Sequence, residues 1–371
     1  MQSPTTGPAS PLFEPIRLGR VMLRNRIVMA PMTRARATPD GLHHPLTPLY
    51  YAQRASAGLL IAEATSVSRQ GAGYPMIPGL WTDPQESNLR LLVEAVHARG
   101  GKLFVQLFHM GRVAHRSLTR GQPMAPSPIA PEGQTMDAEL KQQPFETPRA
   151  MSTAEIEGVV REFAGAALRA IQAGADGVEI HAANGYLIDQ FLRDGTNHRI
   201  DGYGGSPERR ARFLAEVVAA TAARVGGDRV GVRLSPFNPF NSMSDSDPRS
   251  TFVAAARALK PLGLAYLHVI EQGGRRDPVI PRALQLTPEL AREFGGPMMA
   301  NGGYSCESAQ EALRSGWADL VAFGTPFISN PDLVDRFRTG APLAEADPAT
   351  FYGGGEKGYT DYPAWRLPDA R

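Results

Sequence analysis

Eight short apolar runs, several of them rich in β-branched residues, alternate with stretches of helical periodicity over most of this chain. Short apolar runs between turn residues are typical of strands that are buried on both faces of a parallel sheet. The predicted strands are residues 27–29, 59–62, 103–107, 177–180, 230–234, 264–270, 297–300 and 320–323.

Helix signals lie in the gaps between these runs. The clearest begins at Ser152 and Glu155, which have the spacing of a capping box and precede apolar side chains that recur on one helical face. Similar patterns cover residues 88–99, 208–225, 251–259 and 305–315. Eight buried strands, each followed by a helix, predict an α/β fold with a closed TIM (β/α)8 barrel, whose reactive groups lie at the carboxyl ends of the strands. A doubly wound open sheet is the alternative.

The length of 371 residues allows one large barrel or two to three ordinary domains. Because the strand and helix signals alternate so regularly, we expect a single domain over residues 1–371, with a flexible N-terminus at 1–11 and an irregular C-terminal tail at 351–371. Residues 111–150 interrupt the pattern, since they are rich in Pro, Gln and Met and show no clear periodicity. A loop of this length is typical of a lid, with a simple surface excursion as the alternative.

Charge and composition exclude several classes of function. The net charge is +2 and opposite charges are interspersed, so no nucleic-acid partner is indicated. The apolar runs are too short to cross a bilayer and the N-terminal residues do not resemble a signal peptide, so we expect a cytoplasmic protein without a membrane partner. The single cysteine, Cys306, cannot supply an iron–sulfur cluster. The spacing of His43, His44, His109 and His115 matches no usual zinc site, so no metal is expected.

The most informative stretch is residues 174–192, where a predicted strand is followed by His181, Asn184 and Tyr186. An imidazole and an amide can each offer an N–H to one oxygen, which would polarise a carbonyl group and stabilise the enolate that develops from it. A neighbouring phenol can supply a proton. The alternative is structural: His181 ends the strand, Asn184 shapes an Asn-Gly turn and Tyr186 packs in the core. The three residues alone leave both interpretations open.

Other predicted strand ends also carry polar groups, which a purely structural barrel does not need. These are Thr33, Glu63, Thr65, Gln106, Arg233 and Asn301. Glycines follow the last two strands at Gly302, Gly303 and Gly324, where backbone N–H groups can approach an anion closely. They predict a phosphorylated ligand, with tight strand-to-helix turns as the alternative.

Several motifs, taken in order and with their separations, resemble the Old Yellow Enzyme family from about Leu12 to Pro363. They are NRIVMAPMTRARA from Asn25, AEATSVSRQGAGYP from Ala62, QLFHMGR from Gln106, HAANGYLIDQFL from His181, NHRIDGYGGSPERRARF from Asn197, FGTPFISNPDL from Phe323 and GYTDYP from Gly358. Threonine rather than cysteine at Thr33 resembles one branch of that family.

The resemblance implies an FMN-dependent ene-reductase with its flavin at the carboxyl face of the barrel. Thr33 is expected to reach the O4 edge of the flavin and Arg233 the N1 and O2 edge, where a guanidinium stabilises the negative charge of the reduced ring. The other implied contacts with the ring or its phosphate are Pro31, Met32, Ala64, Gln106, Gly302, Gly303, Gly324 and Thr325.

The resemblance also implies the reaction, in which NADPH or NADH provides hydride and an α,β-unsaturated carbonyl or nitro compound accepts it at the β-carbon. His181 and Asn184 would bind the oxygen of this activated alkene, and Tyr186 would protonate its α-carbon. The substrate pocket is expected to include Tyr74, Phe108 and Tyr352. Monomers and homodimers are both compatible with the resemblance.

One departure from the family pattern concerns the cofactor phosphate. Thr325 stands where family members usually have an arginine that pairs with this phosphate. A hydroxyl offers one neutral hydrogen bond in place of a charge-assisted fork, a difference of about 1–2 kcal/mol, so we expect weaker but functional FMN binding. Arg275, Arg276 or Arg282 could compensate.

Two alternative functions stay open from the sequence. One is a non-redox barrel lyase or isomerase that acts on a phosphorylated metabolite. The other is a flavin-binding module with altered turnover.

Overall fold

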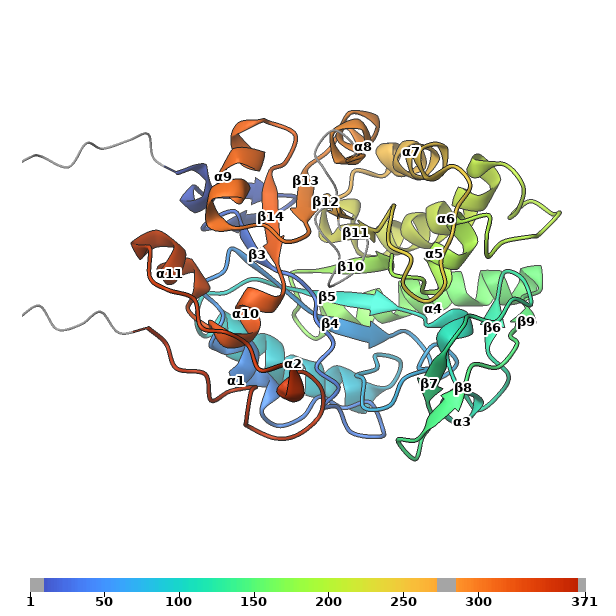
Figure 1. Cartoon of the computed structure of the whole chain (residues 1–371), viewed down its shortest axis with the longest axis horizontal. Coiled ribbons are helices and arrows are strands. Elements are labelled where there is room, and N and C mark those ends of the chain that lie inside the picture. Colours follow the sequence, from blue (N-terminus) through green and yellow to red (C-terminus); the bar gives the residue numbers. More distant parts are fainter. Residues whose placement is uncertain (1–9, 272–284, 366–371) are drawn as a thin grey trace, which may run out of the picture.

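Eight parallel strands close into one barrel in the computed structural model, which describes residues 10–271 and 285–365 (Figure 1). Neighbours in the barrel follow the order of the chain, and β14 pairs with β3 to close it. The barrel strands are β3 (Ile27–Met29), β4 (Leu59–Ser66), β5 (Leu103–Phe108), β10 (Gly177–Ala182), β11 (Val230–Leu234), β12 (Tyr266–Ile270), β13 (Met298–Asn301) and β14 (Leu320–Phe323). The predicted barrel is confirmed, and the open-sheet alternative is wrong.

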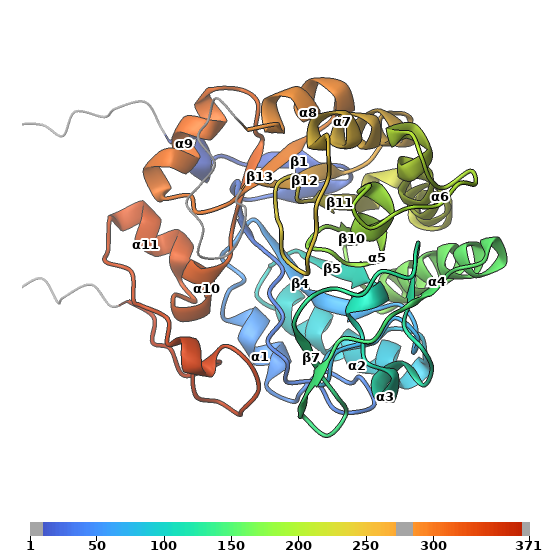
Figure 2. The ribbon, with the colours of Figure 1, turned by 45° about the vertical axis from the view of Figure 1, so that its right-hand side comes forward.

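Helices surround the barrel on its outside (Figures 1 and 2). They are α1 (Thr47–Ala52), α2 (Asp83–His97), α4 (Thr153–Gln172), α5 (Leu187–Leu192), α6 (Pro207–Val225), α7 (Pro248–Leu259), α8 (Thr287–Phe294), α9 (Cys306–Arg314), α10 (Thr325–Ser329) and α11 (Leu333–Thr339). In the described ranges, no helix combines the length and apolar character that crossing a bilayer requires.

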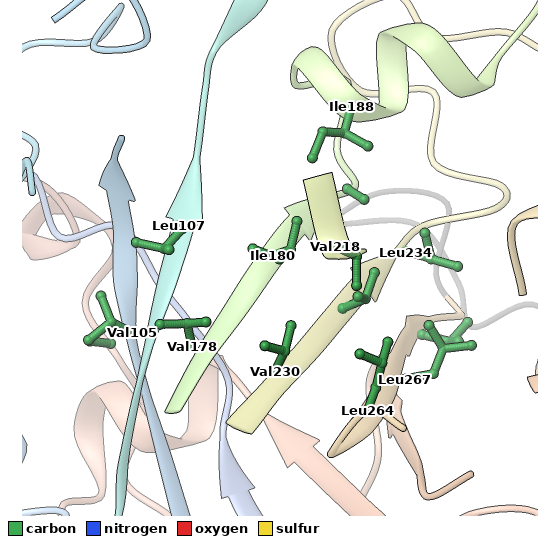
Figure 3. Close-up of a cluster of buried hydrophobic side chains, with 14 of the residues drawn as sticks. Val105, Leu107, Val178, Ile180, Ile188, Val218, Val230, Leu234, Leu264 and Leu267 are labelled. Carbon is green, nitrogen blue, oxygen red and sulfur yellow. The ribbon is translucent and has the colours of Figure 1, made fainter. Parts of the chain in front are cut away.

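The main apolar core lies between the strands and these helices. Figure 3 shows part of it, a buried cluster that includes Val178 and Ile180 of β10, Ile188 of α5 and Val218 of α6. Alternate residues of each strand point outward into this core, while the residues between them point into the barrel.

Local capping sets where several helices begin. The Ser152 amide donates to the Glu155 carboxylate at 2.9 Å, which confirms the predicted start of α4. Two other helices start earlier than apolar periodicity predicts. The Gln85 side chain accepts from the Thr82 amide at 3.1 Å, so α2 starts at Asp83, and the Asp247 side chain accepts from Ser250 at 3.1 Å ahead of α7.

The amino end of the barrel has an apolar floor. The hairpin of β1 (Ile16–Leu18) and β2 (Val21–Leu23) packs its leucines against interior residues of the barrel in one buried cluster. The rings of Phe104 and Tyr266 lie 5.8 Å apart in this floor. Glycines opposite them leave room for the rings, because a Cβ atom at Gly177 would lie 2.4 Å from Phe104 and one at Gly231 would lie 2.2 Å from Tyr266.

Residues 111–150 leave the barrel after β5 and form small elements of their own. These are a 3-10 turn (Gly111–Val113), α3 (Arg116–Thr119), a parallel pair of β6 (Met124–Ala125) and β9 (Arg149–Ala150), and a hairpin of β7 (Gln134–Met136) and β8 (Gln142–Pro144). The buried guanidinium of Arg112 donates to the carbonyls of Ile129, Asn241 and Ser242 at 2.9–3.0 Å. This segment is therefore tied to the loop after β11, and its role as a lid stays a prediction.

The two predicted ends of the chain lie partly outside the described residues. Of the N-terminus expected to be flexible at 1–11, residues 1–9 are not described, and of the tail at 351–371, residues 366–371 are not described. Residues 351–365 form turns without helix or strand.

The barrel floor generates a prediction about stability. Gly231→Ala is expected to lower the free energy of unfolding by about 1–3 kcal/mol, because its Cβ must push the enclosed Tyr266 ring out of place. Gly165→Ala is the matched control: this exposed α4 glycine has no heavy atom within 4 Å of an added Cβ, so stability should stay or rise by about 0.5–1 kcal/mol. Urea denaturation checks both, and equal midpoints for the two variants would contradict the packing described.

Candidate active site

The side chains predicted from the sequence converge at the carboxyl end of the barrel, where two adjoining cavities open. The larger cavity has a volume of about 360 Å³ and the smaller about 260 Å³. Both are lined by Pro31, Thr33, Asn184, Phe240 and Tyr352. The larger cavity is also lined by Met32, Asn301, Gly324 and Thr325, and the smaller by Ala64, Tyr74, Gln106, Phe108, Met110, His181, Tyr186 and Arg233.

Three rings form one wall of the smaller cavity. His181 is the last residue but one of β10, and Tyr186 lies at the start of α5 with its ring edge-on to His181, at a centroid distance of 4.8 Å and an angle of 76°. Phe108, the last residue of β5, lies edge-on to Tyr186 at 5.3 Å. The imidazole and the phenol are thus side by side at the same cavity, as the sequence motif predicts.

Asn184, which lies between His181 and Tyr186 in the sequence, has an unusual backbone conformation. Its backbone has φ of 58°, in the left-handed region that asparagine tolerates better than most residues. The Asn184 amide N–H donates to Ser235 Oγ at 2.8 Å, and its side-chain oxygen Oδ1 accepts from Asn238 Nδ2 at 2.8 Å. Because Oδ1 already accepts a hydrogen bond from the protein, the Nδ2 group of Asn184 is the part left to donate to a ligand.

Burial fixes the protonation of the two titratable rings. It lowers the pKa of His181 well below the ordinary value, and the neighbouring positive charge of Arg233 lowers it further, so the imidazole is neutral. Its Nδ1 atom is buried and has no hydrogen-bond partner among the described residues. Burial also raises the pKa of Tyr186 to about 12, so the phenol keeps its proton at neutral pH. The site therefore presents a neutral donor and a proton-bearing phenol together.

A buried polar layer lies inside the barrel below these rings. Gln106 Nε2 donates to Glu179 Oε1 at 2.7 Å, and Arg233 Nη2 donates to Asn301 Oδ1 at 2.9 Å. The Nε atom of Arg233 is buried without a hydrogen-bond partner in the described part of the chain. Gln106 and Arg233, both predicted from the sequence, thus offer amide and guanidinium groups to a ligand in the smaller cavity.

Sequence reasoning missed some residues of this site. Glu179 precedes His181 by two positions in the same strand, so strand periodicity places both inside the barrel; a carboxylate in a buried strand is the signal that would have found it. His268, in the middle of β12, gives the same signal. Asn238 lies in the loop after β11, where no pattern marks it.

The C-terminal segment forms the outer wall of both cavities. Tyr352 follows Phe351, whose carbonyl accepts from Arg34 Nε at 2.9 Å. Arg34 also donates to the Gly358 carbonyl at 2.9 Å, and its guanidinium lies 5.0 Å from the centre of the buried Tyr50 ring. Buried hydrogen bonds thus hold this segment against the barrel, although Tyr352 and Tyr50 are about 300 residues apart in sequence.

The predicted phosphate residues are only partly brought together. Gly324 and Thr325 line the larger cavity, and Thr325 is the first residue of α10. Gly302 and Gly303 have positive φ values but are not among the residues that line either cavity, so their role stays a prediction. Arg275, Arg276 and Arg282 lie outside the described residues.

A closed parallel barrel with polar side chains around cavities at its carboxyl end has the architecture of the (β/α)8-barrel enzymes. Within residues 10–271 and 285–365, no group of three or more His, Cys, Asp or Glu side chains is arranged to hold a metal ion.

Comparisons with known proteins indicate which family of barrel enzymes this chain resembles. Residues 11–344 match the model of the NADH:flavin oxidoreductase / NADH oxidase family. The chain is 41% identical to 12-oxophytodienoate reductase 2 of Arabidopsis thaliana over 361 residues, which cover 95% of this chain and 96% of that relative. The structure of the old yellow enzyme homologue from Zymomonas mobilis matches with a TM-score of 0.91 at 44% identity, covering 95% of this chain and 99% of that one. Morphinone reductase in complex with tetrahydroNAD matches with a TM-score of 0.90 at 46% identity, covering 97% and 99%.

The chain therefore belongs to the Old Yellow Enzyme family of NADH:flavin oxidoreductases. It is an oxidoreductase, with FMN as its cofactor and a nicotinamide as its hydride donor, as the sequence predicts. The non-redox lyase or isomerase is accordingly set aside. The assignment to the threonine branch stays a prediction.

The residues at the mouth of the barrel fit an FMN on their own chemistry. Arg233 has a buried N–H without a partner in the described part of the chain, which suits the electron-rich edge of an isoalloxazine ring. Gly324 leaves the larger cavity open, since the nearest atom to an added Cβ would be Met32 Sδ at 3.6 Å. The two cavities share five lining residues, so an elongated ligand can extend from one into the other.

The position of Thr325 generates a prediction about cofactor affinity. Thr325→Arg is expected to bind FMN about tenfold more tightly, because a guanidinium at the larger cavity would add a charge-assisted bond to the phosphate. Titration of apoprotein with FMN, followed by quenching of flavin fluorescence, measures the Kd. Thr325→Met is the control, since it adds length without charge and should not gain affinity. Equal Kd values for wild type and Thr325→Arg would show that the phosphate does not lie at this residue.

Proposed function

We propose that this protein is an ene-reductase that reduces the C=C bond of α,β-unsaturated carbonyl or nitro compounds. One observation carries the proposal: His181, Asn184 and Tyr186 line a single cavity that also contains Gln106 and Arg233. Two neutral N–H donors and one phenol are the groups that polarising an alkene and protonating it require.

The cofactor would lie across the mouth of the barrel, with the residues of both cavities around it. Thr33, Gln106 and Arg233 would contact the polar edge of the ring, and Gly302, Gly303, Gly324 and Thr325 would donate to the phosphate. Pro31, Met32 and Ala64 would border the ring. When bound, FMN supplies the hydride chemistry, which no side chain of the chain can provide.

His181 and Asn184 would bind the substrate oxygen. The neutral imidazole and the Nδ2 group of Asn184 each donate one hydrogen bond to it, which withdraws electron density from the alkene and makes the β-carbon a hydride acceptor. The same donors strengthen their bonds as negative charge develops on this oxygen, so they stabilise the transition state more than the ground state. Two hydrogen bonds hold Asn184 in place, one from its backbone N–H to Ser235 Oγ and one from Asn238 Nδ2 to its side-chain Oδ1.

Tyr186 would complete the reduction by giving its proton to the α-carbon. The product then has two new C–H bonds, one at the β-carbon from the hydride and one at the α-carbon from the proton of Tyr186. The phenolate regains a proton from solvent. Burial that keeps Tyr186 protonated suits this role, because the acid must be present in every turnover at neutral pH. Tyr74, Phe108 and Tyr352 would shape the space that the substrate occupies.

Tyr186→Phe tests the proposed acid. Reduction of the bound flavin by NADPH or NADH should keep its rate, while reoxidation by 2-cyclohexenone should slow by about 10²-fold or more, since general acids contribute about 10²–10⁴-fold. Anaerobic stopped-flow absorbance separates the two half-reactions. A variant in which nicotinamide oxidation slows and alkene reduction does not would contradict the assignment. Yellow wild-type protein that oxidises no nicotinamide would instead support a flavin-binding module with altered turnover.

The pKa values of the site predict how alkene reduction depends on pH. Tyr186 loses its proton only near pH 12, and His181 gains one only well below its ordinary pKa of 6.5. The rate with 2-cyclohexenone should therefore not change through either group between about pH 6.5 and about pH 9. Stopped-flow reoxidation across this range measures it, with Tyr186→Phe as the comparison. A decline above about pH 8 that is absent from Tyr186→Phe would mean that the phenol titrates in this range.

A further inference from the structure

The buried carboxylate of Glu179 lies inside the barrel and has no role in the proposed reaction. Three side chains donate to it: Gln106 Nε2 to Oε1 at 2.7 Å, and Tyr266 OH and His268 Nδ1 to Oε2 at 3.1 and 2.8 Å. Burying a carboxylate is costly unless it accepts such bonds, and a barrel floor can be closed by apolar residues alone. We therefore expect a buried carboxylate below an active site, such as that of Glu179, to have a function.

The first consequence of this carboxylate concerns the amide of Gln106. An ionised carboxylate only accepts hydrogen bonds, so Gln106 must face Glu179 with its NH2 group. The carbonyl oxygen of the same amide then faces away from Glu179. Because Gln106 lines the smaller cavity, this oxygen is the acceptor available to a ligand. Oxidised isoalloxazine has one ring N–H, at N3, and an acceptor is what that N–H needs.

The second consequence concerns charge. Burial raises the pKa of Glu179, but the hydrogen bonds from His268 and Gln106 and the positive charge of Arg233 outweigh it and hold this pKa below the ordinary value, so Glu179 is ionised. Burial lowers the pKa of His268, which stays neutral despite Glu179. Glu179 and Arg233 are therefore opposite charges in the same buried layer, and each favours the charged form of the other.

We propose that Glu179 is a positioning residue for the cofactor: it sets which way the Gln106 amide faces, and its negative charge offsets Arg233 at the cavity. The proposal rests on the proposed function, since it needs a flavin at this mouth. An uncompensated Arg233 would stabilise the anionic reduced cofactor and make it a weaker hydride donor. With Glu179 beside it, the guanidinium of Arg233 can still bind the cofactor, but it stabilises the reduced form less.

Two substitutions separate orientation from charge. Glu179→Gln keeps the length of the side chain and an oxygen that can accept from Gln106, but it removes the charge. Reduced FMN should then bind about tenfold more tightly relative to oxidised FMN than in wild type, which raises the midpoint potential by about 30 mV for a two-electron couple. Spectroscopic titration against a reference dye measures the potential.

Glu179→Asp keeps the charge but shortens the side chain by one methylene group, so its carboxylate no longer reaches Gln106. Oxidised FMN should bind about tenfold more weakly, with a midpoint potential close to that of wild type. The Kd comes from fluorescence titration of apoprotein. Tyr266→Phe is the packing control, because it removes one donor to the other carboxylate oxygen and leaves both the charge and the Gln106 contact. Its Kd for FMN should stay within about twofold of the wild-type value, and its midpoint potential should stay close to that of wild type.

The outcomes decide between this proposal and its failure. If Glu179→Gln leaves the potential unchanged and Glu179→Asp leaves the Kd unchanged, or if Tyr266→Phe produces the same shifts, the proposal is overturned. If Glu179→Gln does not fold, Glu179→Asp decides alone: weaker FMN binding supports the proposal and an unchanged Kd overturns it. Wild-type apoprotein that binds no FMN would overturn the proposed function itself, and this proposal with it.

Discussion

The site depends on one constraint, which is that polar and charged groups are enclosed within a barrel whose floor is apolar. Phe104, Tyr266 and the leucines of the N-terminal hairpin seal the amino end, so the polar groups above them must satisfy one another or a ligand. Glu179 and Asn301 accept from Gln106 and Arg233 and thereby fix their orientation. The polar atoms of Gln106 and Arg233 that do not take part in these hydrogen bonds face the cavity. The barrel floor thus determines which atoms the mouth of the barrel offers.

This constraint also explains the protonation of the reacting groups. The same burial that lowers the pKa of His181 raises that of Tyr186, because each ring is held in its neutral form by lack of solvent. A neutral imidazole donates without carrying a charge of its own, and a neutral phenol retains its proton. Both properties come from one environment, so a substitution that admits water beside Phe108 would alter both rings together.

Much of the fold and part of the site could be predicted from the sequence. Strands buried on both faces form short apolar runs that can be recognised in a single sequence. Three of the eight have the predicted bounds, namely Ile27–Met29, Val230–Leu234 and Leu320–Phe323. Residues in the carboxyl halves of strands, such as His181 and Gln106, follow from the strand itself, because parallel strands end at the same face. Helix starts were less predictable, since α2 and α7 begin at caps that lie before their apolar faces.

What the sequence could not give is the set of contacts between distant loops. Asn238 fixes the Asn184 side chain across 54 positions, and Arg34 holds the Phe351 carbonyl across 317. Neither pair has a local pattern, because a hydrogen bond between loops depends on where the barrel places them. The groups proposed for chemistry lie mainly on strands and at their immediate ends, while the cavity walls at Tyr74, Phe240 and Tyr352 come from loops and from the C-terminal segment. A barrel arranged in this way can change the shape of its substrate pocket through loop residues while the strands keep the reacting groups in place.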